Sequence, residues 1–128
     1  MPQTQFRDHI IVVQNPDDYI EVQTSPANIF KGWELSPFAH ELLNRDGSIK
    51  TESDLSGDTL QKFIAASEAI KRSEPLEKPI LGIGLNDDIE IGVGREIIAA
   101  AYHAGLTSIP TNIPKGQADC VQQFLNTL

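Results

Sequence analysis

The sequence PILGIGLNDDIEIGVGREIIAAAYHAGLTSIPTNIP, residues 79–114, has the clearest secondary-structure pattern in the chain. It contains two apolar runs, residues 80–85 and 89–93, and in the second run apolar residues occupy alternate positions. This period of two, with an Asn-Asp-Asp sequence between the runs, predicts a β-hairpin. From Gly94 onward, apolar residues recur on one helical face until Gly105, which suits a left-handed helix C-cap. The stretch therefore predicts a hairpin followed by a helix.

Helical spacing also occurs outside this stretch. Ser36 followed by a proline predicts an N-cap and a short helix over residues 37–45. A longer helix is expected to begin near Ser56 or Asp58 and to stop before Pro75, because the apolar residues between them share one face. A closing helix is predicted by an apolar face made of Cys120, Val121, Phe124 and Leu125. On this interpretation Cys120 is a buried, small hydrophobic residue.

The remaining segments predict three strands and one irregular connection. Residues 10–13 form a short β-branched run, and a turn is expected to join them to a strand over residues 19–23, which gives a second hairpin. Residues 25–35 show no clean period, so an irregular, packed connection is predicted there. A strand over residues 107–113 is expected at a sheet edge, because Pro110 lacks the N–H that a strand ladder needs.

The expected fold class is α+β, a mostly antiparallel sheet built from two hairpins plus an edge strand, with three to four helices packed on it. The length of 128 residues and the hydrophobic content of 40% suit a single domain over residues 1–128. The first residues lack a signal-peptide pattern, and every apolar run is shorter than the roughly 20 residues of a membrane helix. A single cysteine allows no intramolecular disulfide, which favours the cytoplasm.

The chain is acidic, with 18 Asp and Glu residues against 10 Lys and Arg residues and a formal net charge of -8. Negative charge repels nucleic-acid phosphates, so a nucleic-acid partner is not expected. It speeds the encounter with a basic protein, although scattered acids on many proteins serve solubility alone. The acidic pairs that stand in expected turns are Asp17 with Asp18, and Asp87 with Asp88.

A glycine-rich loop connects the central hairpin to the helix that follows it. Gly92 and Gly94 stand where backbone amides could approach a phosphate, with Arg95 as its charge partner. The third glycine and the distal acid of a dinucleotide-binding motif are missing. The other interpretation is that these glycines permit close packing of helix against strand. An anion site here would comprise Gly92, Gly94, Arg95, Glu96, Tyr102 and His103, with the last two as proton donors.

Other candidate sites lack part of their ligand set. Asp87, Asp88 and Glu90 could meet His103 in space as a carboxylate and imidazole site, although hairpin tips are often acidic for conformational reasons. Residues 44–49 imitate the centre of a calcium-binding loop, but neither terminal ligand position carries an acid, so a plain turn is expected. We therefore expect no metal ion, no cofactor and no catalytic residue.

Phe30 and Trp33 are the aromatic candidates for a contact surface, with filling of one end of the core as the alternative. No motif points to a particular family. We expect a small acidic binding protein rather than an enzyme, an inhibitor or immunity-type protein that docks on a basic protein partner. The residues expected to contact that partner are Asp17, Asp18, Phe30, Trp33, Asp87 and Asp88. The alternative function is a small enzyme or ligand-binding domain that uses the Gly92–Glu96 loop for an anionic ligand.

Overall fold

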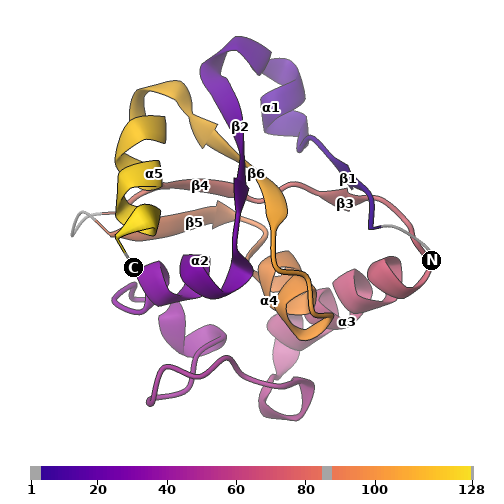
Figure 1. Cartoon of the computed structure of the whole chain (residues 1–128). Helices are drawn as coiled ribbons and strands as arrows, with labels where there is room; N and C mark the ends of the chain where they lie inside the picture. Colours follow the sequence, from indigo (N-terminus) through magenta and orange to yellow (C-terminus); the bar gives the residue numbers. More distant parts are fainter. Residues whose placement is uncertain (1–3, 85–87, 128) are drawn as a thin grey trace.

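The central sheet has four strands in the order β2-β6-β4-β5, as the computed structural model of the chain shows (Figure 1). The structure describes residues 4–84 and 88–127. Strands β2 (Tyr19–Thr24) and β6 (Ile109–Pro114) are antiparallel, as are β4 (Ile80–Ile83) and β5 (Ile89–Val93). Strands β6 and β4 are parallel where Ile80 pairs with Asn112. A separate two-stranded parallel sheet joins β1 (Phe6–Arg7) to β3 (Leu76–Glu77).

The described residues form five α-helices: α1 (Ile10–Gln14), α2 (Pro26–Trp33), α3 (Gly57–Lys71), α4 (Arg95–His103) and α5 (Ala118–Asn126). Short 3-10 turns accompany them at η1 (Pro16–Asp18), η2 (Ala39–Glu41), η3 (Glu52–Asp54) and η4 (Lys115–Gln117). Helix α3 packs along α4, and α2 contacts α4, α5 and β5. In Figure 1, α1 and η1 lie at one end of the molecule, and α2 with the loop that follows it lies toward the other.

The core lies where α2, α4 and α5 meet the sheet. Its fully buried large side chains include Ile29, Trp33, Leu42, Ile89, Ile98, Ile113 and Val121. Helix α2 approaches the sheet closely because Gly32 has no side chain: a Cβ there would lie 2.8 Å from Ile89 Cγ1 and 2.9 Å from Phe124 Cε1. Each large buried apolar side chain contributes roughly 1.5–3 kcal/mol, so this core supplies most of the favourable folding energy.

The central stretch folds as predicted. Strands β4 and β5 pair as an antiparallel hairpin, and α4 follows immediately. Gly105 has a φ of +85° just after the helix, and its N–H donates to the carbonyl oxygen of Tyr102. Helices α3 and α5 also match expected helices. The prediction for Cys120 is wrong, because the buried face of α5 consists of Ala118, Val121 and Leu125, and Cys120 lies exposed beside it.

The predicted N-terminal hairpin is wrong. Residues 10–13 belong to α1, whose N-cap His9 accepts the N–H of Ile11 at Nδ1, 3.1 Å away. A β-branched run favours a strand, but a capped turn of helix that ends before Pro16 satisfies the backbone groups locally. Strand β2 pairs with β6 instead, so the four-stranded sheet is mixed rather than mostly antiparallel.

The secondary structure predicted for residues 25–45 is also wrong. Helix α2 forms where an irregular connection was expected, because Ser25 Oγ caps it by accepting the N–H of Asn28 and Pro26 stands in its first turn. The helix expected over residues 37–45 is a loop that contains the 3-10 turn η2. Within it Leu43 pairs with Ile49 in an isolated antiparallel bridge, which holds this segment away from a helical conformation.

Strand β6 occupies an inner position of the sheet, not the predicted edge. Successive N–H groups of a strand point to opposite sides, and the N–H of Asn112 donates to Pro79 O, 2.9 Å away, beside β4. Positions 110 and 114 face the same side as Asn112. Since β4 meets β6 at Asn112, the missing N–H groups of Pro110 and Pro114 remove no ladder bond to β2.

Candidate functional site

Gly94, but not Gly92, is needed for close packing of backbone against backbone in the Gly92–Glu96 loop. Gly94 has a φ of +90°, and a Cβ at this position would lie 3.1 Å from Pro79 Cα. A Cβ on Gly92 would make only an ordinary contact, 3.6 Å from the carbonyl oxygen of Ile80. Gly94 is therefore required both by its left-handed conformation and by its contact with the chain entering β4.

Arg95, the charge partner expected for an anion, already has partners within the protein. Its NH1 atom lies 2.8 Å from Glu41 Oε2. Its guanidinium carbon stands 5.5 Å from the ring centre of Trp33 and 5.0 Å from that of Phe38. An ion pair and two cation–π contacts hold this side chain between α2 and the loop after it, and these contacts account for Arg95 as a structural residue.

The structure does not bring Tyr102 and His103 to this loop. They stand at the C-terminal end of α4, about 10–12 Å along the helix axis from Arg95 at the rise of ~1.5 Å per residue. The His103 Nε2 atom donates to the carbonyl oxygen of Lys50, 2.8 Å away, and its ring contacts those of Phe63 and Tyr102. Helix α4 thus separates the two halves of the anion site considered from the sequence.

Glu90 of the central hairpin does not join His103 in the carboxylate and imidazole site considered from the sequence. Glu90 accepts the indole N–H of Trp33 at 3.1 Å and the hydroxyl of Ser36 at 3.4 Å, so it faces the core end of α2 and not His103. Asp88 is buried, and Asp87 lies outside the described residues. The described part of the chain contains no group of three or more metal-ligating side chains.

The predicted aromatic contacts lie in the interior. Phe30 and Trp33 are 2% and 0% exposed, and their rings pack with centroids 5.9 Å apart. Here they fill one end of the core, which is the alternative that the sequence left open. A partner therefore cannot reach these two rings in this fold.

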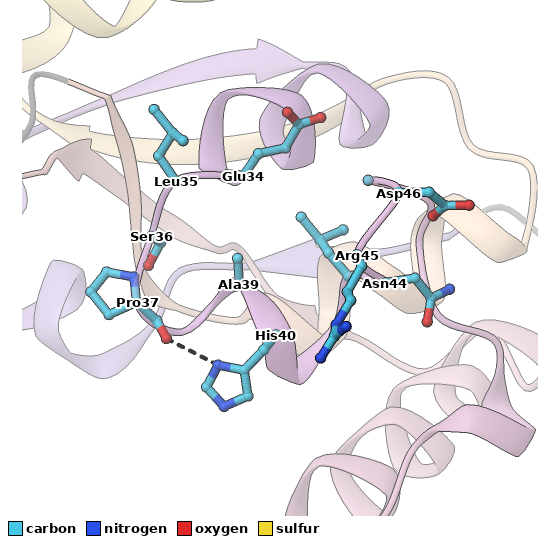
Figure 2. A pocket seen from close by; sticks show the side chains of 11 residues that line it. Glu34, Leu35, Ser36, Pro37, Ala39, His40, Asn44, Arg45 and Asp46 are labelled. Carbon is cyan, nitrogen blue, oxygen red and sulfur yellow. Dashed lines mark hydrogen bonds between the residues drawn. The ribbon is translucent and has the colours of Figure 1, made fainter.

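A shallow pocket of about 510 Å³ lies in the loop after α2 (Figure 2). Leu35, 74% exposed, stands on its rim, and His40 Nδ1 donates to the carbonyl oxygen of Pro37 at 3.0 Å. Asp46 Oδ1 accepts both the hydroxyl and the N–H of Ser48, which lowers the pKa of Asp46. This is the geometry of a plain turn, because the Asp46 carboxylate accepts its hydrogen bonds from a residue only two positions further along the chain.

The N-terminal segment, residues 10–20, carries four of the seven exposed large apolar side chains among the described residues. Helix α1 buries Val12 but leaves Ile10 and Val13 56% and 57% exposed, and Ile11 and Ile20 are each 40% exposed. Asp17 and Asp18 stand between these residues in η1, and both are exposed. The sequence did not predict this surface, because a β-branched run favours a buried strand. Exposed apolar side chains in a group, with acids beside them, are typical of protein-binding surfaces.

A charged cluster beside the N-terminal segment ties it to the sheet. Lys78 Nζ donates to the carboxylates of Asp8 and Glu21, and Asn112 Nδ2 donates to Asp8 at 3.1 Å. The bond from Lys78, helped by that from Asn112, lowers the pKa of Asp8. Burial alone would lower the pKa of Lys78, but its bonds to Glu21 and Asp8 raise that pKa. Two carboxylates share one ammonium, so the cluster keeps a net negative charge.

Comparison of the chain with known protein families, with curated proteins and with solved structures finds no match. Within residues 4–84 and 88–127, none of the helices combines the length and the apolar composition needed to cross a membrane.

Proposed function

We propose that this chain is a small acidic binding protein, of the inhibitor or immunity type, that docks on a basic protein through its N-terminal segment. The observation that supports the proposal is the grouping of exposed Ile10, Ile11, Val13 and Ile20 with Asp17 and Asp18 in eleven consecutive residues. Apolar side chains at the centre of an interface supply affinity through burial, and charges at its rim supply partner choice and association rate. Asp17 and Asp18 are the residues of this segment that the sequence also predicts to contact the partner.

The charge of the whole chain supports a basic partner. A formal charge of -8 attracts a cationic surface over a distance of about one Debye length, roughly 8–10 Å at physiological salt. The exposed side chains of Asp17 and Asp18 accept no hydrogen bond within the described structure, so their charges remain available to a partner. The proposal places this encounter in the cytoplasm, where the exposed thiol of Cys120 would stay reduced.

Affinity capture with three baits tests the proposal. The baits are the unaltered chain, the charge-reversed variant Asp17→Lys/Asp18→Lys, and the control Glu52→Lys/Asp58→Lys. Both variants change the net charge from -8 to -4, but Glu52 and Asp58 are exposed residues of η3 and α3 near the other end of the molecule (Figure 1). Proteins captured from the source cells are identified by mass spectrometry, purified and titrated calorimetrically with each bait.

The expected partner has a basic surface, binds the control bait nearly as well as the unaltered chain, and loses about tenfold or more in affinity to the Asp17 and Asp18 variant. Its affinity should also fall as salt is raised from 50 to 500 mM. A partner whose binding is insensitive to both salt and the Asp17 and Asp18 reversal would contradict the proposal.

A further inference from the structure

We infer that the free edge of β2 accepts an extended basic segment of the partner as an added, fifth strand of the central sheet. This inference rests on the function proposed above and assigns a binding mode to it. Strand β2 ends the order β2-β6-β4-β5, so one of its two edges has no neighbouring strand in the described structure. Unpaired strand edges bind extended peptides through main-chain hydrogen bonds.

The register identifies the backbone groups on this edge. Thr111 Oγ1 donates to the carbonyl oxygen of Val22 at 2.9 Å, and Asn112, the residue opposite Glu21, directs its N–H toward β4. The even-numbered residues of β2 therefore exchange bonds with β6. The N–H and C=O groups of Tyr19, Glu21 and Gln23 point away from the sheet, and they make no other hydrogen bond with a described residue. Six backbone groups are available to an added strand.

Charge selects a basic segment as the occupant. Glu21 is the middle outward-bonding residue of β2, and its side chain remains 47% exposed although it pairs with Lys78. The cluster of Asp8, Glu21 and Lys78 carries one more negative than positive charge. A lysine or arginine opposite Glu21 would complete this charge balance, and opposite charges on paired strands stabilise the pair.

The same residue disfavours a second copy of this chain. Antiparallel pairing of β2 with β2 of another copy, in the register that pairs all three outward-bonding residues, places Tyr19 opposite Gln23 and Glu21 opposite Glu21. Like charges directly opposite each other on paired strands are destabilising, and two chains of formal charge -8 repel each other as they approach.

The side chains of β2 also define the pattern of the added strand. Ile20, which is exposed, and Val22, which is half-buried, share the face opposite to that of Glu21. An added strand of alternating basic and apolar residues would place its cations beside Glu21 and its apolar side chains beside Ile20 and Val22. Helix α1, which carries exposed apolar side chains, lies near the start of this strand (Figure 1), so one partner segment can follow both features.

Three capped nine-residue peptides test the inference with the full chain. In the first peptide lysine alternates with valine, and in the second glutamate replaces every lysine. The third has the sequence of the first, with N-methyl groups on the alternate backbone nitrogens that would face β2. Binding is measured by NMR titration, with hydrogen exchange of the amides of Tyr19, Glu21 and Gln23 as the structural readout. The variant Gln23→Pro removes one outward N–H, and Gln23→Ala is its control because both lose the side-chain bond from Ser108.

The lysine peptide should bind and slow exchange of the three amides by tenfold or more, whereas N-methylation and Gln23→Pro should each weaken binding at least tenfold. Gln23→Ala should leave binding within about twofold. Equal binding of the methylated and unmethylated lysine peptides, or failure of the lysine peptide to bind, would overturn strand addition without affecting docking through Asp17 and Asp18. Stronger binding of the glutamate peptide would contradict the proposed function itself. A dimer of the free chain that Gln23→Pro dissociates would assign the edge to a second copy and overturn the inference.

Discussion

Substitution of three glycines by alanine separates the two roles that the structure gives to Gly94. A left-handed φ costs an alanine about 1–2 kcal/mol, and Gly94 and Gly105 share this conformation, with φ of +90° and +85°. Only Gly94 has the added contact, because its Cβ would lie 3.1 Å from Pro79 Cα, whereas nothing lies within 4 Å of a Cβ at Gly105. Forcing an extra carbon into a packed site costs about 1–3 kcal/mol more.

The expected loss in the free energy of unfolding is therefore about 2–5 kcal/mol for Gly94→Ala and about 1–2 kcal/mol for Gly105→Ala. Gly92 has neither a positive φ nor a close contact. Gly92→Ala should be neutral or stabilising by up to about 1 kcal/mol, because alanine has fewer unfolded conformations to lose.

Urea unfolding measures all three changes with one probe. The chain has one tryptophan, Trp33, and its complete burial makes its fluorescence report the loss of the core. With an m-value of about 2 kcal/mol/M, Gly94→Ala should lower the midpoint by about 1–2.5 M and Gly105→Ala by about 0.5–1 M. A midpoint for Gly94→Ala no lower than that for Gly105→Ala would refute the assignment of Gly94 to contact with Pro79.

Three further predictions concern single side chains. The lowered pKa of Asp8 means that its pair with Lys78 stabilises the fold above the ordinary aspartate pKa of about 4 and is lost as the pH falls through the lower, folded value. Urea unfolding from pH 6 to pH 2 should thus show a smaller loss of stability for Asp8→Asn than for the unaltered chain, by less than about 1 kcal/mol because Asp8 is partly exposed. Arg95→Ala should lower the free energy of unfolding by about 1–3 kcal/mol and red-shift the emission of Trp33, since it removes the pair with Glu41 and the cation–π contact; an unchanged stability would contradict that structural role. The exposed Cys120 should react with a thiol reagent in the native protein at a rate within about tenfold of that in urea, and protection of the thiol until the protein unfolds would show it to be buried.

The elements that could be predicted from the sequence are those whose backbone bonds are local. The β4–β5 hairpin, α3, α4 and α5 each have a clear apolar period and a turn or cap at their ends. Gly105 was recognisable for the same reason, because a helix C-cap depends only on neighbouring residues.

Helix α2 carried a signal that was missed. Pro26, Ile29, Phe30 and Trp33 have helical spacing behind the capping Ser25. Gly32 obscured it, since glycine is unfavourable inside a helix, and its role here depends on Ile89 and Phe124 from elements distant in the sequence.

The position of β6 and the exposed side chains of α1 depend on contacts that the sequence does not contain. Whether Pro110 is tolerated in an inner strand depends on which neighbour its nitrogen faces, and that follows only from the pairing with β2 and β4. The N-terminal segment has strand-like composition, but the N-cap at His9 makes it a helix with three apolar side chains in water. Partner binding by the exposed acids Asp17 and Asp18 therefore stays a prediction, and the apolar residues beside them were not predicted as part of the site.

Docking through the N-terminal segment is tested most directly by calorimetric titration of the captured partner with two single variants. Val13→Ser and Leu35→Ser each remove an exposed apolar side chain, 57% and 74% exposed respectively. Val13 belongs to α1, at one end of the molecule, and Leu35 belongs to the loop after α2, which lies toward the other end (Figure 1). Val13→Ser should weaken binding about tenfold, since loss of a buried interface side chain of this size costs about 1–2 kcal/mol, and Leu35→Ser should change it by less than twofold. Weaker binding by Leu35→Ser, with Val13→Ser unchanged, would place the interface at the other end of the molecule and contradict the proposal.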